Sequence, residues 1–237
     1  MKDIQLSLVI PTYNEEENIK NLLETTSRIL KIIPISFELI VVDDGSKDQT
    51  RSIVKKLQKD NKEIILIERD KERGLATALI RGYKASQGQY LGTMDADFAH
   101  NPKYLLTMIN LLNLNQADFI IGSRYVKGAQ FKGKPILNLM ASIVGQFLVK
   151  IILGVKVKDS SNNYRIFKRE VWEKIKNQLH SDGNIMLTEI VYRASQNNFR
   201  IREIPILYIE RRIGKSKLSL FKETIKFFKN IWKIKNY

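Results

Sequence analysis

The sequence predicts an α/β fold in which a mainly parallel β-sheet is covered by helices on both faces. Short apolar runs, typical of buried strands, alternate with longer amphipathic segments, and this alternation indicates βαβ units. Several of the apolar runs end in polar or acidic loops, as expected at the carboxyl ends of parallel strands. With 237 residues, of which 43% are hydrophobic and 27% charged, the chain can bury the core of such a fold.

Five strands are expected where short apolar runs are bounded by turn residues, at residues 6–10, 37–42, 64–68, 90–94 and 119–122. Pro11 ends the first of them. The polar loop that follows is expected to start a helix reaching about Ile32, with Asn14 or a neighbour as N-cap and glutamates in the first turn. Further helices are expected at residues 48–60, from Gly74 to Ala85, and after Asn101 and Pro102.

The fourth strand ends in Asp95 and Asp97, which are separated by one residue. Because alternate side chains of an extended chain share a face, the two carboxylates can converge at the carboxyl edge of the sheet. Converging carboxylates suit Mg²⁺ or Mn²⁺, which takes its remaining oxygens from substrate phosphates. A solvated loop is the plain alternative, since aspartate is common in turns.

Two other strand ends add polar side chains to this edge. The loop after the first strand carries Tyr13 and Glu15, and the second strand runs into Asp43 and Asp44. The chain has no G-x-G-x-x-G after its first strand and no P-loop motif, so dinucleotide-binding and P-loop hypotheses lose their main support. A carboxylate-rich edge needs a cation before it can hold a phosphate, which favours the metal hypothesis.

The net charge of +15 indicates an anionic partner, which could be a nucleic acid, a phosphorylated substrate or an anionic membrane surface. Residues 211–237 contain nine lysines and arginines against one acid, Glu223. The chain has no cysteine and therefore no disulfide or thiolate metal site. The first residues lack the apolar segment of a signal peptide, so a cytoplasmic location is expected.

Two segments have the pattern of helices that lie on a membrane surface. Residues 135–154 are strongly apolar, but four polar residues recur every four positions, which favours an interfacial helix over a transmembrane span; they are Asn138, Ser142, Gln146 and Lys150. A core-packing helix is the alternative. Residues 219–237 place aromatic and aliphatic side chains opposite lysines, as in a basic amphipathic helix on an anionic membrane.

Six segments together resemble the family 2 glycosyltransferases of GT-A fold, and most closely the dolichol-phosphate (polyprenyl-phosphate) mannose synthase branch. The segments are PTYNEEENI (11–19), VVDDGSKDQT (41–50), ERGLATALIRGY (72–83), MDADFAHNP (94–102), GSRY (122–125) and ERRIGKSKL (210–218). They follow in the family's order over nearly the whole chain. The resemblance implies an inverting transfer of a hexose, usually mannose from GDP-mannose, onto the phosphate of a polyprenol.

The resemblance also assigns roles to residues of this chain. Asp95 and Asp97 would hold Mg²⁺ or Mn²⁺ and the diphosphate, and Arg124 would contact the acceptor phosphate beside Ser142. Arg212 and Lys217 would close over the donor. The donor nucleotide pocket would be lined by Pro11, Tyr13, Glu15, Val42, Asp44 and Ala96. Residues 1–218 would form the catalytic domain, and residues 219–237 the membrane-surface helix.

The chain departs from the family pattern at three places. Relatives often carry glutamine where this chain has Ala99, so water or backbone would complete the metal's coordination. They also tend to carry arginine where this chain has Asn138, which could shift one phosphate contact to Lys132 or Lys134. The usual T-S-G-F-R is replaced by residues 160–165, SSNNYR.

Several alternatives remain open at the level of sequence. The donor could be UDP-glucose or another UDP-sugar, and the acceptor a sugar or glycolipid. A basic nucleic-acid-binding protein is a more distant alternative, disfavoured because acids gather at the predicted ligand edge and no nucleic-acid motif is present, so no nucleic-acid partner is expected. The expected partners are a nucleotide sugar, a polyprenyl phosphate, the cytoplasmic membrane surface and, as a further candidate, a small membrane-anchoring subunit.

Overall fold

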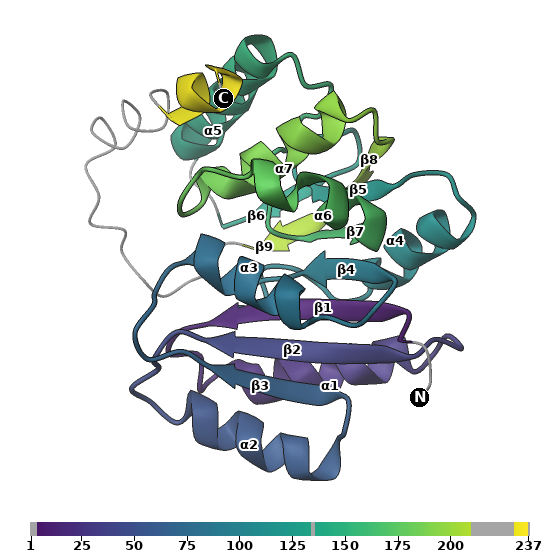
Figure 1. The fold of residues 1–237 in the computed structure, drawn as a ribbon, viewed down its shortest axis with the longest axis vertical. Helices are drawn as coiled ribbons and strands as arrows, with labels where there is room; N and C mark the ends of the chain where they lie inside the picture. The colour runs from purple at the N-terminus through teal and green to yellow at the C-terminus, as the bar shows by residue number, and fades with distance from the viewer. Residues whose placement is uncertain (1–3, 134–135, 210–229, 237) are drawn as a thin grey trace.

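The computed structural model describes residues 4–133, 136–209 and 230–236, and its centre is a seven-stranded sheet with the order β3-β2-β1-β4-β7-β5-β8 (Figure 1). β7 runs antiparallel to both of its neighbours, and the other pairings are parallel. A small second sheet pairs β6 with β9. The strands are β1 (Leu6–Thr12), β2 (Phe37–Asp43), β3 (Ile64–Glu68), β4 (Tyr90–Thr93), β5 (Phe119–Ser123), β6 (Gln130–Lys132), β7 (Arg165–Lys168), β8 (Ile201–Pro205) and β9 (Leu207–Ile209).

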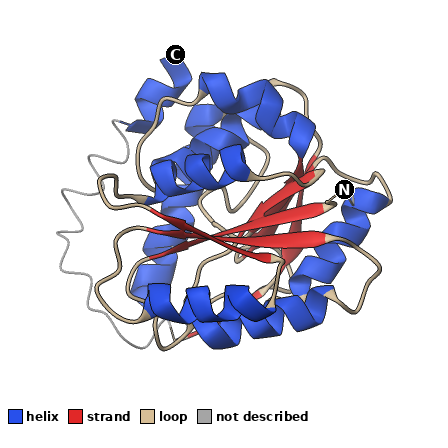
Figure 2. Cartoon of the chain, turned by 60° about the horizontal axis from the view of Figure 1, so that its bottom comes forward, coloured by secondary structure: helices blue, strands red, loops and turns tan. Residues whose placement is uncertain are grey.

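Helices cover both faces of the large sheet (Figure 2). One apolar core lies between the sheet and α1 (Ile19–Leu30), α2 (Thr50–Asp60) and α4 (Tyr104–Asn113). The other lies under α3 (Leu75–Ala85), α6 (Arg169–Ile175) and α7 (Ile185–Gln196), and includes the inner side of α5 (Ile136–Leu153) and of residues 230–236, which are helical. A short 3₁₀ turn, η1 (Lys176–Gln178), follows α6.

The predicted α/β architecture is confirmed: all five expected strands are present and run in the same direction, so their carboxyl ends lie at one edge of the sheet. The pattern gave no indication of β6, β7, β8 and β9. β1 continues through Pro11 to Thr12, although Pro11 was expected to end it. β4 pairs with β1 only as far as Val9, so Pro11 lies where β1 has a single neighbour, and a missing N–H is tolerated there.

The first helix begins later than expected, at Ile19 rather than near Asn14. Asn14 has a φ of 55°, in the left-handed region, and the three glutamates lie in the turn before the helix. The cause is a set of long-range bonds, because the backbone N–H of Glu15 donates to Thr50 and that of Glu16 donates to Asp48. This loop is therefore fastened to the loop after β2.

In the part of the chain that the structure describes, no helix is long and apolar enough to cross a membrane.

Asp118 joins three neighbouring strands at the edge opposite the strand carboxyl ends. It precedes β5 and accepts hydrogen bonds from the Arg200 backbone N–H (3.0 Å), from the Arg200 guanidinium and from Lys168 Nζ (2.8 Å). The hydrogen bond from Arg200, supported by Lys168, holds the pKa of Asp118 well below its usual range. At pH values above the usual pKa of an aspartate, the charged carboxylate therefore stabilises the fold. This stabilisation is lost as the pH falls toward the lowered pKa of the folded state.

We expect Asp118→Asn to lower the free energy of unfolding by about 2 kcal/mol near neutral pH, because two charge-assisted bonds are weakened. The difference from the wild type should narrow below about pH 4, where Asp118 of the unfolded wild-type chain begins to be protonated while that of the folded chain is still charged. Urea unfolding of both proteins across this range checks the prediction. A difference that stays constant with pH would contradict it.

Candidate active site

A cavity of about 240 Å³ lies at the carboxyl edge of the sheet, where β1, β2 and β4 end. Seven residues that the sequence placed in a donor or metal site line it: Pro11, Tyr13, Glu15, Asp44, Asp95, Ala96 and Asp97. Thr12 and Leu75 complete the lining, and sequence reasoning had not selected either. Val42 is not among the lining residues, because its side chain points into the core and is fully buried there.

Asp44 is held in a fixed orientation by its neighbours. Arg69 donates from Nε to its Oδ1 at 2.8 Å, Nη2 of Arg69 forms an ion pair with the same oxygen at 2.7 Å, and the backbone N–H of Gly74 donates to Oδ2 at 2.8 Å. Gly74 has a φ of 118°, a conformation that residues with a side chain rarely adopt. Arg69 was not selected from the sequence. It directly follows β3, which ends at the same edge of the sheet, and this position could have identified it.

Asp95 is oriented by a side chain from a distant part of the sequence. The amide of Asn163 donates to Oδ1 of Asp95 at 2.6 Å, and the hydroxyl of Thr93 donates to Oδ1 of Asn163 at 3.2 Å. Oδ2 of Asp95 lies 3.6 Å from Nδ1 of His100. The side chain of Asp95 remains 36% exposed, so its carboxylate is held at the cavity wall and open to a ligand.

Asp97 lies on the same wall, and its Oδ1 accepts a bond from the backbone N–H of Ala99 at 3.0 Å. Ala99 is itself buried. Within the described residues, no group of three or more histidine, aspartate or glutamate side chains is placed to hold a metal ion. A pair of carboxylates is nevertheless the donor set that Mg²⁺ uses with a diphosphate, since substrate oxygens and water complete the shell. The residues present therefore fit a divalent ion bound together with its substrate.

His100 lies behind the two aspartates and is fully buried. Its ring stacks on Tyr164 with centroids 5.0 Å apart and meets Tyr208 at 5.5 Å. Burial lowers the pKa of His100, although the negative charges of Asp95 and Asp97 oppose the shift. The imidazole is therefore neutral near neutral pH and packs against the aspartates without neutralising them.

Arg124 follows β5 and reaches the same edge of the sheet from the other side of β7. Its Nε and Nη2 donate to the two oxygens of Asp159, each at 2.8 Å, and Nη2 also donates to Ser161 at 3.2 Å. Burial would lower the pKa of Arg124, but the bonds to Asp159 outweigh this and raise it above its usual value. Arg124 is thus a permanent cation held in one orientation.

Two aromatic rings flank this cation. The guanidinium carbon of Arg124 lies 5.3 Å from the ring centre of Tyr125 and 5.4 Å from that of Tyr208. Ser142 of α5 is hydrogen-bonded to Tyr125, so the predicted serine contacts a tyrosine that flanks the predicted arginine. Asp159 and Tyr208 had not been selected from the sequence.

α5 turns both apolar and polar side chains toward the protein. Val149 and Leu153 join the core under α3, α6 and α7, while Gln146 accepts a bond from the Ser160 N–H at 2.9 Å and donates to Ser161 at 3.0 Å. Its outer side exposes large apolar side chains, each between 46% and 61% accessible; they are Met140, Ile143, Val144, Phe147 and Ile151. Figure 1 shows residues 230–236 beside α5, and Trp232 of that segment is 67% exposed.

Several predicted residues lie outside the described part of the chain. They are Arg212 and Lys217, the alternative phosphate contact Lys134, and the part of the expected terminal helix before residue 230.

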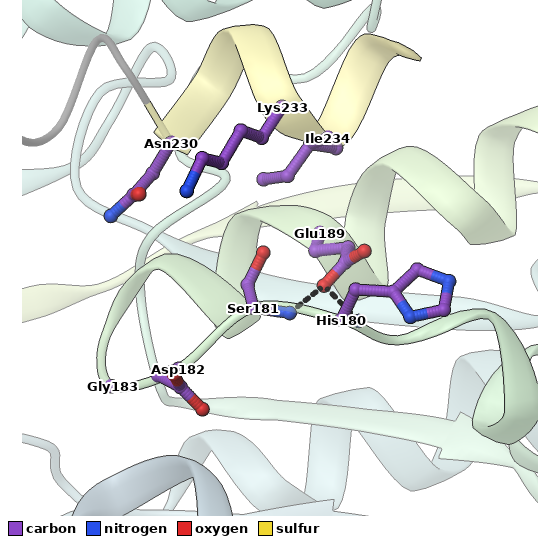
Figure 3. Close-up of a pocket in the computed structure, with 8 residues that line it drawn as sticks. All are labelled: His180, Ser181, Asp182, Gly183, Glu189, Asn230, Lys233 and Ile234. Atoms are coloured by element: carbon purple, nitrogen blue, oxygen red, sulfur yellow. Dashed lines mark hydrogen bonds between the residues drawn. The ribbon is translucent and has the colours of Figure 1, made fainter. Parts of the chain in front are cut away.

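A second, larger cavity of about 430 Å³ lies elsewhere, between the loop at residues 180–183, α7 and the terminal helical segment (Figure 3). Its buried acid, Glu189, is already used by the protein, since it accepts bonds from the backbone N–H groups of His180 (3.0 Å) and Ser181 (2.8 Å). None of the residues predicted for the donor, acceptor or metal lines this cavity.

The sequence model described as "Glycosyl transferase family 2" matches residues 7–176. The polyprenol monophosphomannose synthase of Mycolicibacterium smegmatis is 33% identical over 217 residues, which cover 90% of this chain and 80% of the relative. The dolichol-phosphate mannosyltransferase of Pyrococcus furiosus is 31% identical over 235 residues, covering 98% of this chain and 64% of that relative, so the chain spans less than two thirds of its length.

Solved structures show the same fold. The glucosyl-3-phosphoglycerate synthase of Mycobacterium tuberculosis, in complex with Mn²⁺, UDP and phosphoglyceric acid, matches with a TM-score of 0.71 and 16% identity. The match covers 97% of this chain and 78% of that structure. A complex of the same synthase with Mg²⁺ and UDP matches with the same TM-score and covers 80% of that chain.

Proposed function

Because the chain belongs to glycosyl transferase family 2, we propose that it transfers a hexose from a nucleotide diphosphate sugar onto a polyprenyl phosphate. GDP-mannose is the favoured donor, since both named relatives are mannose synthases or mannosyltransferases acting on a polyprenol or dolichol phosphate. The observation that carries the proposal is the cavity at the sheet edge, where Asp95 and Asp97 meet the residues after β1 and β2.

The donor nucleotide occupies this cavity, with Asp44 as an acceptor for N–H groups of the base. Asp95 and Asp97 hold Mg²⁺ or Mn²⁺ beside the diphosphate. When bound, the divalent ion stabilises the negative charge that develops on the leaving diphosphate. Arg212 and Lys217 are proposed to assist at the same diphosphate.

Arg124 binds the acceptor phosphate at the end of β5, which is separated from the donor cavity by β7. One oxygen of this phosphate forms the new bond to the anomeric carbon, while the bond from that carbon to the diphosphate breaks and the diphosphate leaves with the electron pair. A phosphate monoester is already ionised near neutral pH, so the attack needs no strong general base. A single displacement inverts the configuration at the sugar carbon.

A membrane surface is the proposed location of the reaction, on the cytoplasmic leaflet. The outer side of α5 presents its apolar side chains away from the core while its polar side holds the loop at residues 160–161. Such a face fits the headgroup boundary of a bilayer and would bring the lipid phosphate to Arg124. Residues 219–237 are proposed as a second, basic contact with the membrane, although Ile231 and Ile234 of this segment pack into the core of the catalytic domain. A small membrane-anchoring subunit is proposed as a further partner.

We expect Phe147→Glu to weaken binding to vesicles of phosphatidylcholine and phosphatidylglycerol about tenfold or more, because a side chain exposed to 59% would lose its burial in lipid. Leu114→Glu is the matched control, since Leu114 is exposed to 58% at the end of α4, away from α5. Co-sedimentation with the vesicles measures both. Equal binding of the two variants would contradict the proposed membrane face.

The proposed reaction is tested by transfer of labelled sugar into the organic phase in the presence of polyprenyl phosphate and membranes. GDP-mannose, UDP-glucose and UDP-N-acetylglucosamine are compared, each with and without Mn²⁺ or Mg²⁺. Metal-dependent transfer from GDP-mannose alone is the expected result. Transfer from a UDP-sugar would instead select that donor, and transfer to a free sugar but not to the lipid would overturn the proposed acceptor.

A further inference from the structure

The loop at residues 159–164, between α5 and β7, contacts both the donor cavity and the proposed acceptor site. Asn163 is 4% exposed and donates its amide to Asp95, while Asp159 is fully buried and binds Arg124 in a bidentate pair. Asn163 is held in turn by the hydroxyl of Thr93, at the end of β4. Asp95 in the sugar-donor site and Arg124 in the acceptor site are thus oriented by the same loop.

We infer that Asn163 is a positioning residue for Asp95, and that it fixes the carboxylate in the orientation that receives the divalent ion and the diphosphate. This inference rests on the proposed metal role of Asp95. Side chains that hydrogen-bond to metal ligands set the direction of the ligand's lone pairs, and their loss typically weakens metal binding about 10–100-fold.

The chemistry of the amide suits this role. Asn163 is neutral, so it orients Asp95 without cancelling the negative charge that attracts the ion, whereas an arginine or lysine at the same distance would compete with the ion. Asn163 therefore leaves the charge of Asp95 available at the cavity.

Arg165 keeps the loop in the shape that this contact needs. It is fully buried, and its guanidinium donates to the backbone carbonyls of Leu187 (2.8 Å) and Ser160 (3.2 Å) and to that of Asn162. Burial lowers the pKa of Arg165 to about 10, so it remains charged near neutral pH. The loop is therefore anchored to α7 as well as to the strand that follows it.

The test is direct titration of Mn²⁺ in the presence of GDP, with unbound Mn²⁺ followed by its electron paramagnetic resonance signal. Asn163→Ala is expected to raise the dissociation constant of Mn²⁺ about 10–100-fold. Asn162→Ala is the matched control, because its buried amide on the same loop donates instead to the backbone carbonyl of Gly122. This control is expected to bind Mn²⁺ as the wild type does.

Thr93→Val removes the hydroxyl that holds Asn163 while keeping the shape of the side chain, so it should weaken Mn²⁺ binding in the same direction but by less. It also provides the test if Asn163→Ala does not fold. Wild-type Mn²⁺ affinity in Asn163→Ala or, should that variant not fold, in Thr93→Val would overturn the inference, as would equal weakening in Asn162→Ala. Absence of Mn²⁺ binding by the wild-type protein with GDP or UDP would instead overturn the proposed metal role itself.

Discussion

Asp97→Ala is expected to reduce kcat/KM for sugar transfer at least about a thousandfold while leaving the fold intact. The substitution removes one of the two carboxylates at the cavity, and with it the ion that stabilises the leaving diphosphate, a contribution of about 4 kcal/mol or more. The structural cost is expected to be small, because Asp97 is partly exposed at the wall of the cavity. Initial rates of labelled transfer, together with a melting curve, measure both quantities.

Asp182→Ala is the control for this variant. Asp182 is an exposed acid that lines the larger cavity between the 180–183 loop and the terminal helical segment (Figure 3). Its loss should leave transfer unchanged. Wild-type turnover by Asp97→Ala, or a comparable loss in Asp182→Ala, would contradict the assignment of the donor site to the sheet edge.

The second large effect is expected at Arg124. Arg124→Met should reduce kcat/KM for the lipid phosphate at least about a hundredfold, because a permanently charged partner for the acceptor is lost. Binding of the donor nucleotide should change little, since Arg124 is not among the residues that line the donor cavity. Steady-state kinetics with varied lipid phosphate measures the effect on the acceptor, and nucleotide titrations measure the effect on donor binding.

A structural effect accompanies this variant and needs its own control. Asp159 is fully buried and would be left without its partner, which typically costs about 3–5 kcal/mol. The double variant Arg124→Met/Asp159→Asn removes both charges and should recover most of the lost stability. It should not recover transfer; if it does, Arg124 acts only as the partner of Asp159 and does not bind the acceptor.

The sheet edge was predictable from sequence because its signals are local. Apolar runs mark β1, β2 and β4, and each is followed by polar residues, so parallel pairing alone brings Tyr13, Asp44 and Asp95 to one cavity. β7 was not expected, because it is four residues long and pairs antiparallel with strands that lie far from it in the chain. The loop before it was therefore not placed beside Asp95.

The residues that orient the site were missed for the same reason. Asn163 lies 68 positions from Asp95, Asp159 lies 35 positions from Arg124, and Arg69 lies 25 positions from Asp44. No spacing in the sequence links such pairs, and only the sheet order brings them together. Val42 shows a different limit of the sequence pattern: it sits in a motif at the edge, but the alternation of side chains along β2 turns its side chain into the core.

The central claim, that Asp95 and Asp97 hold a metal-bound diphosphate, is tested most directly by crystals grown with Mn²⁺ and either GDP or UDP. X-ray data collected at the manganese absorption edge should show an anomalous peak between Asp97 and the diphosphate, in the cavity that Tyr13 and Asp44 also line. Nucleotide bound without Mn²⁺ at Asp97, or both bound in the cavity of His180 and Lys233, would contradict it.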